Sequence, residues 1–132
     1  MLNKETIRII MENIAKKLEE LDELLAQHTI YISNVKRALN HKTEFQHKNC
    51  HECKFGQVLD KDILPLKDEL PEDIREIINE IERLHCDFHN IISKVDTKRA
   101  SEEDFKTLEK VDREIFLQLL SKILKLKRVV KK

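Results

Sequence analysis

The feature that most constrains this chain is an uncharged seam along residues 7–39, with spacings that alternate between four and three. Its ten members are Ile7, Met11, Ile14, Leu18, Leu21, Leu25, His28, Ile32, Val35 and Leu39. This spacing places all of them on one side of an α-helix. Because no glycine or proline interrupts it, the seam predicts one continuous helix from about residue 4 to about 41, roughly 55 Å long at ~1.5 Å per residue. The only non-apolar member is His28.

The composition agrees with a helical chain. Glycine occurs once among 132 residues and proline twice, while 38% of the residues are charged. Rossmann fingerprints, P-loops and tight β-hairpins need several glycines at positive φ, so these folds are excluded. The formal net charge is zero, which argues against nucleic acid as a partner. We predict an all-α fold.

The prolines and the glycine mark a break between two helical halves. Gly56, Pro65 and Pro71 lie in one short stretch of the chain. We predict residues 42–70 to be irregular, with a short helix around Cys53 to Asp60. Pro71 suits the first position of the next helix. The seam of that helix again contains one histidine: Ile74, Ile78, Ile81, His85, Phe88, Ile92 and Val95.

A polar turn at residues 96–100 precedes the last predicted helix. Ser101 and Asp104 have the spacing of a capping box at its start. The side chains that we expect this helix to bury are Phe105, Leu108, Val111, Ile115, Leu119, Ile123, Leu126 and Val130. Three long helices and a short one predict an antiparallel, four-helix-type bundle that forms a single domain over residues 1–132.

The apolar stripe of the first helix is longer than a bundle of this size requires. Leu24, Ile30 and Tyr31 widen it further. We therefore expect part of this surface to pack against a second copy of the chain, giving a homodimer. The alternative is a slightly elongated monomer.

The histidines in the seams are candidate metal ligands. His85 and His89 lie four residues apart and so project from the same helix face, as a metal-binding pair does. Either seam histidine alone is more often a satisfied core residue, but an unpaired imidazole in a core is costly. Cys50 and Cys53 form a C-x2-C pair without a second such pair to complete a zinc ribbon. Cys86 is turned roughly 100° from its neighbour on the helix, and we interpret it as a small, partly buried residue.

Three sequence blocks, in order, resemble the chemoreceptor zinc-binding domain of bacterial signalling proteins. The first is a histidine followed three residues later by an aromatic residue, in His28-Thr29-Ile30-Tyr31. The second is Cys53-Lys54-Phe55-Gly56, and the third is Leu84-His85-Cys86-Asp87-Phe88-His89. The resemblance covers about residues 15–125.

The resemblance implies one Zn²⁺ ion bound by His28, Cys53, His85 and His89. Four protein ligands fill a tetrahedral zinc site and leave no position for water, which favours a structural or sensory metal over a catalytic one. Oxidation of the Cys53 thiolate would change zinc affinity. Similar proteins sense zinc or oxidants such as hypochlorous acid and signal to chemoreceptor segments or diguanylate cyclase domains. We therefore expect a zinc-binding regulatory domain and not an enzyme.

Two positions depart from the family pattern. Tyr31 and Val58 stand where the family usually has tryptophan, which affects the packing around the site more than the ligands. Gly56 follows the proposed cysteine ligand, and we expect it to permit close packing or an unusual φ there.

Two other functions remain as alternatives, a structural interaction bundle and a helical-bundle metalloenzyme. A di-iron enzyme is disfavoured because its core needs Glu-x-x-His pairs and carboxylates, which the first two seams lack. The sequence has no signal-peptide pattern and no apolar run of membrane-spanning length. We therefore expect a cytoplasmic protein with reduced thiols and no signalling output domain within these residues.

Overall fold

The computed structural model describes residues 3–130, which form an all-α bundle. The elements are α1 (Lys4–His41), α2 (Lys54–Val58), η1 (Leu59–Ile63), η2 (Leu64–Glu69), α3 (Glu72–Ile92), α4 (Glu102–Lys110), η3 (Val111–Ile115) and α5 (Phe116–Val130). No strand occurs within residues 3–130. The predicted fold class and the predicted span of the first helix are confirmed.

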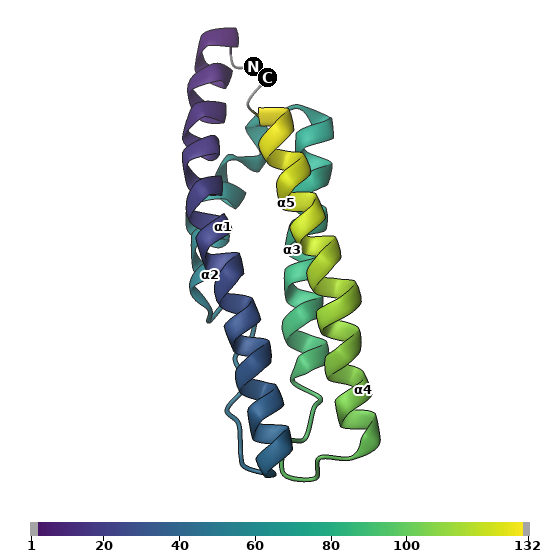
Figure 1. The fold of residues 1–132 in the computed structure, drawn as a ribbon. Helices are drawn as coiled ribbons and strands as arrows, with labels where there is room; N and C mark the ends of the chain where they lie inside the picture. The colour runs from purple at the N-terminus through teal and green to yellow at the C-terminus, as the bar shows by residue number, and fades with distance from the viewer. Residues whose placement is uncertain (1–2, 131–132) are drawn as a thin grey trace.

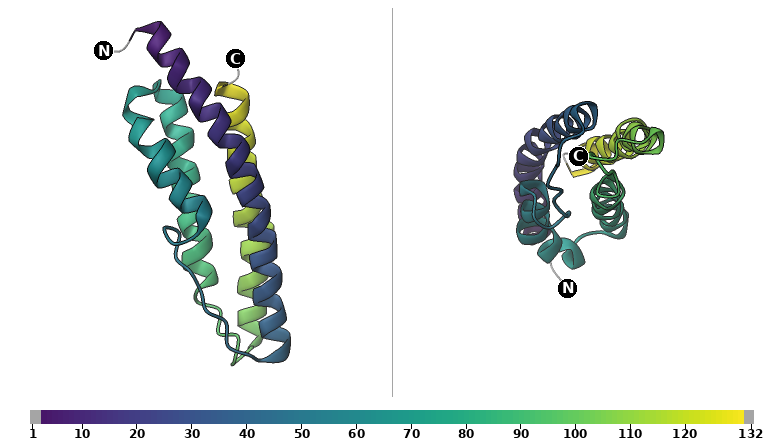
Figure 2. Two further views of the ribbon diagram at one scale, coloured as in Figure 1. Left: turned by 90° about the vertical axis from the view of Figure 1, so that its left-hand side faces the viewer. Right: turned by 90° about the horizontal axis from the view of Figure 1, so that it is seen from below.

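The chain passes along the length of the bundle in alternating directions (Figure 1). α1 and α3 run in the same direction, and the continuous rod of α4, η3 and α5 runs opposite to both. Residues 42–69 return beside α1, first as an extended segment and then as the short helices α2, η1 and η2. Seen along its length, the bundle has α1, α3, α5 and these short helices around a common centre (Figure 2).

Local capping explains where the long helices begin and end. The Asn3 side chain accepts a hydrogen bond from the Thr6 amide at 2.8 Å, and Lys42 ends α1 in the left-handed region at φ 53°. These are ordinary N-cap and C-cap arrangements. Pro71 precedes α3 as its N-cap, one position earlier than predicted. The capping box of Ser101 and Asp104 is present as predicted.

Two predicted details are wrong. Residues 59–69 form a π turn and a 3₁₀ helix, so helical structure extends further than the sequence indicated. Phe105 is 38% exposed, because Asp104 occupies the buried side of the first turn of α4. The Asp104 carboxylate accepts hydrogen bonds from the Arg99 guanidinium and the Asp96 amide, which holds its pKa well below the usual range.

Two apolar cores fill the bundle, one toward each end. The first core joins α1, the short helices, α3 and α5, and includes Leu25 and Leu84. The second core joins α1, α3, α4 and η3, and includes Ile32 and Phe88. His28 lies in the sequence between Leu25 and Ile32, and His85 follows Leu84. The seam histidines therefore lie where the two cores meet.

None of the helices within residues 3–130 combines the length and the hydropathy needed to cross a lipid bilayer.

Candidate metal centre

Four side chains from three elements converge between the two cores. His28 comes from α1, Cys53 is the N-cap of α2, and His85 and His89 come from α3. One ligand atom from each lies within 4.8 Å of all the others. We call these four residues the inner cluster. It brings together every residue that the sequence predicted as a ligand.

Backbone carbonyls set the orientation of two imidazoles. Nδ1–H of His28 donates to the Leu24 carbonyl at 3.1 Å, and Nδ1–H of His89 donates to the Lys48 carbonyl at 2.9 Å. Since a carbonyl can only accept, each ring carries its proton on Nδ1 and leaves the Nε2 lone pair free. Metal-binding histidines are commonly oriented by this kind of contact.

The distances between the ligand atoms suit a small tetrahedral ion. Nε2 of His85 lies 3.2 Å from Nε2 of His28 and 3.2 Å from Sγ of Cys53. Zinc–nitrogen and zinc–sulfur bonds of about 2.0–2.3 Å give tetrahedral edges of roughly 3.3–3.6 Å. Nε2 of His89 is buried and has no hydrogen-bond partner, a costly arrangement that a metal ion would resolve.

Burial keeps the three imidazoles neutral. The side chains of His28, His85 and His89 are 5%, 1% and 1% exposed. Burial, reinforced by the neighbouring histidines, lowers the pKa of His85 to about 2 and that of His89 to about 4. Burial also lowers the pKa of His28. All three rings are thus in the form that binds metal at neutral pH.

The Cys53 thiol is held at the start of a helix but favours its protonated form. Burial raises its pKa, although backbone N–H groups, that of Gly56 first among them, oppose this. The Gly56 amide lies 3.4 Å from Sγ. Because zinc binds the thiolate, loading the site would release a proton from Cys53.

Gly56 makes the turn at Cys53 possible through its lack of a side chain. A Cβ added there would lie 1.7 Å from the carbonyl oxygen of Cys50. The close packing predicted at this position is confirmed. The alternative of an unusual φ is not, since no glycine has a positive φ.

The inner cluster is surrounded by aromatic rings. The ring of Phe55 lies 4.4 Å from that of His85, and Tyr31 and Phe88 lie against His89 at 5.6 and 5.2 Å between centroids. Tyr31, which replaces the family's tryptophan, also accepts a hydrogen bond from the Lys48 amide at 3.1 Å. It thereby holds the residue whose carbonyl orients His89.

One side of the cluster opens to the surface through a cavity of about 350 Å³. His28, Tyr31, Cys53 and His89 contribute to its wall. Cys53 is partly exposed, whereas the three histidines are buried. The thiol is therefore the ligand that a small solute would reach first.

The expectation of reduced thiols is wrong for two of the three cysteines. Cys50 and Cys86 form a disulfide, with their Cα atoms 4.8 Å apart. Cys86 is partly exposed, as predicted, but it is bonded to the cysteine that had no predicted role. The signal was present in the sequence. Cys50 precedes one predicted ligand by three residues and Cys86 directly follows another, so a metal site that joins those ligands also brings the two cysteines together.

Comparison with known proteins identifies one family. The sequence profile of the chemoreceptor zinc-binding domain matches residues 28–95, a span that contains all four cluster residues. Neither the search of curated proteins nor that of solved structures found a significant match.

Proposed function

This chain belongs to the chemoreceptor zinc-binding domain family, and we propose on that premise that it is a zinc-dependent regulatory domain in bacterial signalling. The observation that carries the proposal is the inner cluster, in which four ligand atoms lie within 4.8 Å of one another. Nε2 is unprotonated in His28 and His89, and Nε2 of His89 is buried without a hydrogen-bond partner. Both features favour a bound metal ion, and a His₃Cys donor set suits Zn²⁺.

We assign the zinc ligands as His28, Cys53, His85 and His89. When bound, zinc supplies a charged centre that links α1, α3 and the start of α2. Four protein ligands complete a tetrahedral site, so the chemistry is that of a sensor or a structural brace and not of a hydrolase. Two of these ligands, His28 and His89, are oriented by the carbonyls of Leu24 and Lys48.

Zinc occupancy supplies the signal through linkage. The metal stabilises whichever arrangement of α1 and α3 brings all four ligands together, and its loss relaxes that constraint. The boundary between the two cores lies at these ligands, so a change there reaches both ends of the bundle. A chemoreceptor, a diguanylate cyclase or another bacterial signalling protein would detect the change in the cytoplasm.

Oxidation of Cys53 is a second input to the same site. Hypochlorous acid transfers its oxygen to the thiolate, which becomes a sulfenic acid while chloride leaves. The partial exposure of this thiol and the cavity beside it allow such a small oxidant to approach. The product is a poorer zinc ligand, so oxidation would release the metal.

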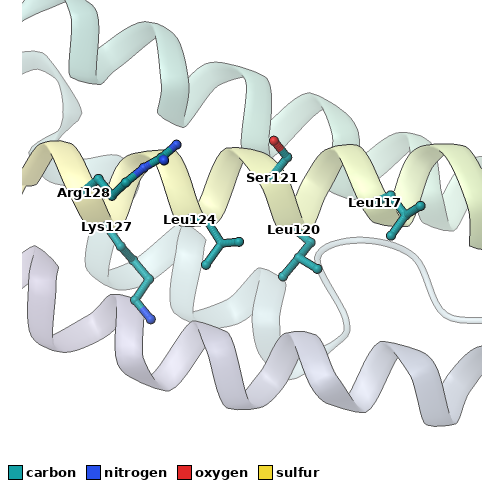
Figure 3. Close-up of a pocket in the computed structure, with 6 residues that line it drawn as sticks. All are labelled: Leu117, Leu120, Ser121, Leu124, Lys127 and Arg128. Carbon is teal, nitrogen blue, oxygen red and sulfur yellow. The ribbon is translucent and has the colours of Figure 1, made fainter.

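A second copy of the chain would cover the remaining apolar surface. Of the three residues that widen the α1 stripe, Ile30 is 59% exposed. A groove of about 570 Å³ lies along α5, where Leu117, Leu120, Leu124 and Lys127 project from the side that faces α1 (Figure 3). We propose that residues 1–132 act as one domain, with a zinc-binding core over about residues 15–125, and that this domain is a homodimer.

Metal analysis tests the assignment. The protein is purified without added metal, dialysed against metal-free buffer and examined by elemental mass spectrometry. We expect one equivalent of zinc per chain. Less than about half an equivalent, or full retention of zinc in a Cys53→Ala variant, would refute the proposed site.

A further inference from the structure

The disulfide connects the two segments that carry the proposed ligands. Cys50 precedes Cys53 by three residues, and Cys86 directly follows His85 on α3. The two half-cystines are 36 residues apart in the sequence. The bond therefore ties the turn that presents the thiol to the helix that presents two imidazoles.

Without this bond, the turn would depend on hydrogen bonds and on the packing of α2. Residues 43–53 form no helix or strand. Lys48 bonds through its amide to the Tyr31 hydroxyl and through its carbonyl to His89. Nε2–H of His47 donates to the Val95 carbonyl at 3.1 Å. These contacts hold residues 47 and 48, whereas the disulfide acts at residue 50, next to the ligand.

We propose that the Cys50–Cys86 disulfide is a reversible clamp whose redox state sets the zinc affinity of the site. This inference rests on the proposed function. When the bond is closed, it restricts the excursions of Cys53 away from His85 and so lowers the entropy cost of assembling the four ligands. When the bond is open, the same ligands must be ordered as zinc binds, and the affinity falls.

A small disulfide such as oxidised glutathione can close the clamp. Cys86 is the more accessible partner, because Cys50 is only 6% exposed. The Cys86 thiolate attacks the small disulfide, whose S–S bond breaks and releases one thiol. The Cys50 thiolate then attacks the Cys86 sulfur of the mixed disulfide and releases the second thiol. The two protein thiols lose two electrons and two protons, which the small disulfide gains as two thiols.

The clamp and the oxidation of Cys53 act in opposite directions. Closing the Cys50–Cys86 bond strengthens zinc binding, whereas forming a sulfenic acid at Cys53 weakens it. A mild disulfide oxidant and a strong oxygen-transferring oxidant would thus produce different outputs from one domain. The two chemistries use different sulfur atoms, so they can be separated by substitution.

Zinc competition in defined redox states tests the clamp. The wild type is prepared with oxidised glutathione or with a phosphine reductant, and alkylation followed by mass spectrometry reports the state of each cysteine. Zinc affinity is then measured against a chromophoric chelator. We expect the oxidised form to bind zinc at least about tenfold more tightly than the reduced form.

The matched control is the Cys50→Ser/Cys86→Ser double variant, with Cys86→Ser alone as a second variant in case the double variant is poorly folded by circular dichroism. Both should bind zinc as the reduced wild type does under either treatment. Equal affinity in the oxidised and reduced wild type, at one zinc per chain, would overturn the clamp and leave the proposed function intact.

Two other results are also informative. Two equivalents of zinc in the reduced wild type would overturn the clamp in favour of a second metal site made by Cys50, His51 and Cys86. Absence of zinc from both redox forms would refute the proposed function together with the clamp that rests on it.

Discussion

Two groups of histidine and cysteine residues lie side by side in this bundle, and they differ in burial, in bonding and in what their side chains contact. The inner cluster contains three buried histidines and Cys53, whereas the outer group contains Cys50, His51 and Cys86. Cys53 is free, while the two outer cysteines are bonded to each other. His51 is exposed and its Nδ1 lies 2.8 Å from the Asp60 carboxylate.

The difference teaches that residue type and proximity do not suffice for a metal site. In the inner cluster, burial holds the imidazoles neutral, and backbone carbonyls orient two of them, His28 and His89. In the outer group, the two sulfurs satisfy each other and the exposed imidazole pairs with a carboxylate. The inner cluster therefore has the features expected of a metal site, whereas the outer group lacks them.

The sharpest test of this contrast removes one histidine from each group. His85→Ala should weaken zinc binding by at least about 100-fold, because His85 contacts both His28 and Cys53 and its loss leaves three ligands. The measurement is the zinc content after dialysis, followed by chelator competition. His51→Ala is the matched control and should retain one equivalent. A His85→Ala variant that keeps a full equivalent would contradict the assignment of the inner cluster.

Gly56→Val should weaken the site without touching a ligand. The new Cβ would collide with the Cys50 carbonyl, so the turn between Cys50 and Cys53 must shift. We expect zinc affinity to fall by about 10- to 100-fold and stability by about 2–3 kcal/mol, with helicity nearly unchanged. Gln57→Val, at the exposed neighbour, controls for valine in this short helix. Unchanged zinc affinity in Gly56→Val would show that the close approach is not required.

Acid should destabilise the metal-free protein through the inner cluster. Above pH 6.5 the three histidines are neutral in both the folded and the unfolded chain, so they add no pH dependence to the free energy of unfolding. As the pH falls below 6.5, the unfolded chain gains protons that the folded chain does not accept until about pH 4 at His89 and about pH 2 at His85. Between its unfolded and its folded pKa, each of these histidines lowers the free energy of unfolding by up to about 1.4 kcal/mol per pH unit.

Chemical denaturation of the metal-free protein between pH 7 and pH 4 measures this loss. A stability that stays constant from pH 6.5 to pH 4 would contradict the burial of neutral imidazoles.

The smallest expected effect is that of Tyr31→Phe. This change removes the hydroxyl that accepts from the Lys48 amide but keeps the ring that packs against His89. Because the Lys48 carbonyl orients His89, we expect zinc affinity to fall by about two- to fivefold, consistent with about 0.5–1 kcal/mol for one hydrogen bond. Isothermal titration calorimetry can resolve this change. A loss as large as that of His85→Ala would mean that Tyr31 does more than position Lys48.

Much of the fold and all four residues of the inner cluster could be predicted from the sequence. The 4-3 spacing predicted α1 with both ends correct, and Ser101 with Asp104 predicted the start of α4. His28 and His85 stood out as histidines in otherwise apolar seams, and His89 as the residue four positions after His85. Their assignment as a set, with Cys53 chosen over Cys50, came from the resemblance to a family and not from the periodicity.

The errors at Phe105 and at the cysteines both arose from contacts that helical periodicity does not describe. Phe105 fits the periodic pattern, but the buried Asp104 network fills its expected side of the helix. The Cys50–Cys86 bond depends on how residues 43–53 lie against α3. Helical periodicity specifies neither arrangement.

The sequence by itself determined the helices, the seams and the identity of the side chains that carry the chemistry, since periodicity, capping and glycine content act over a few residues. The tertiary structure decided which sulfur faces the histidines and which is bonded outside them. That choice depends on a three-residue turn packed against a helix more than 30 residues away in the chain. It also depends on Gly56, whose lack of a side chain lets its backbone pack against the Cys50 carbonyl.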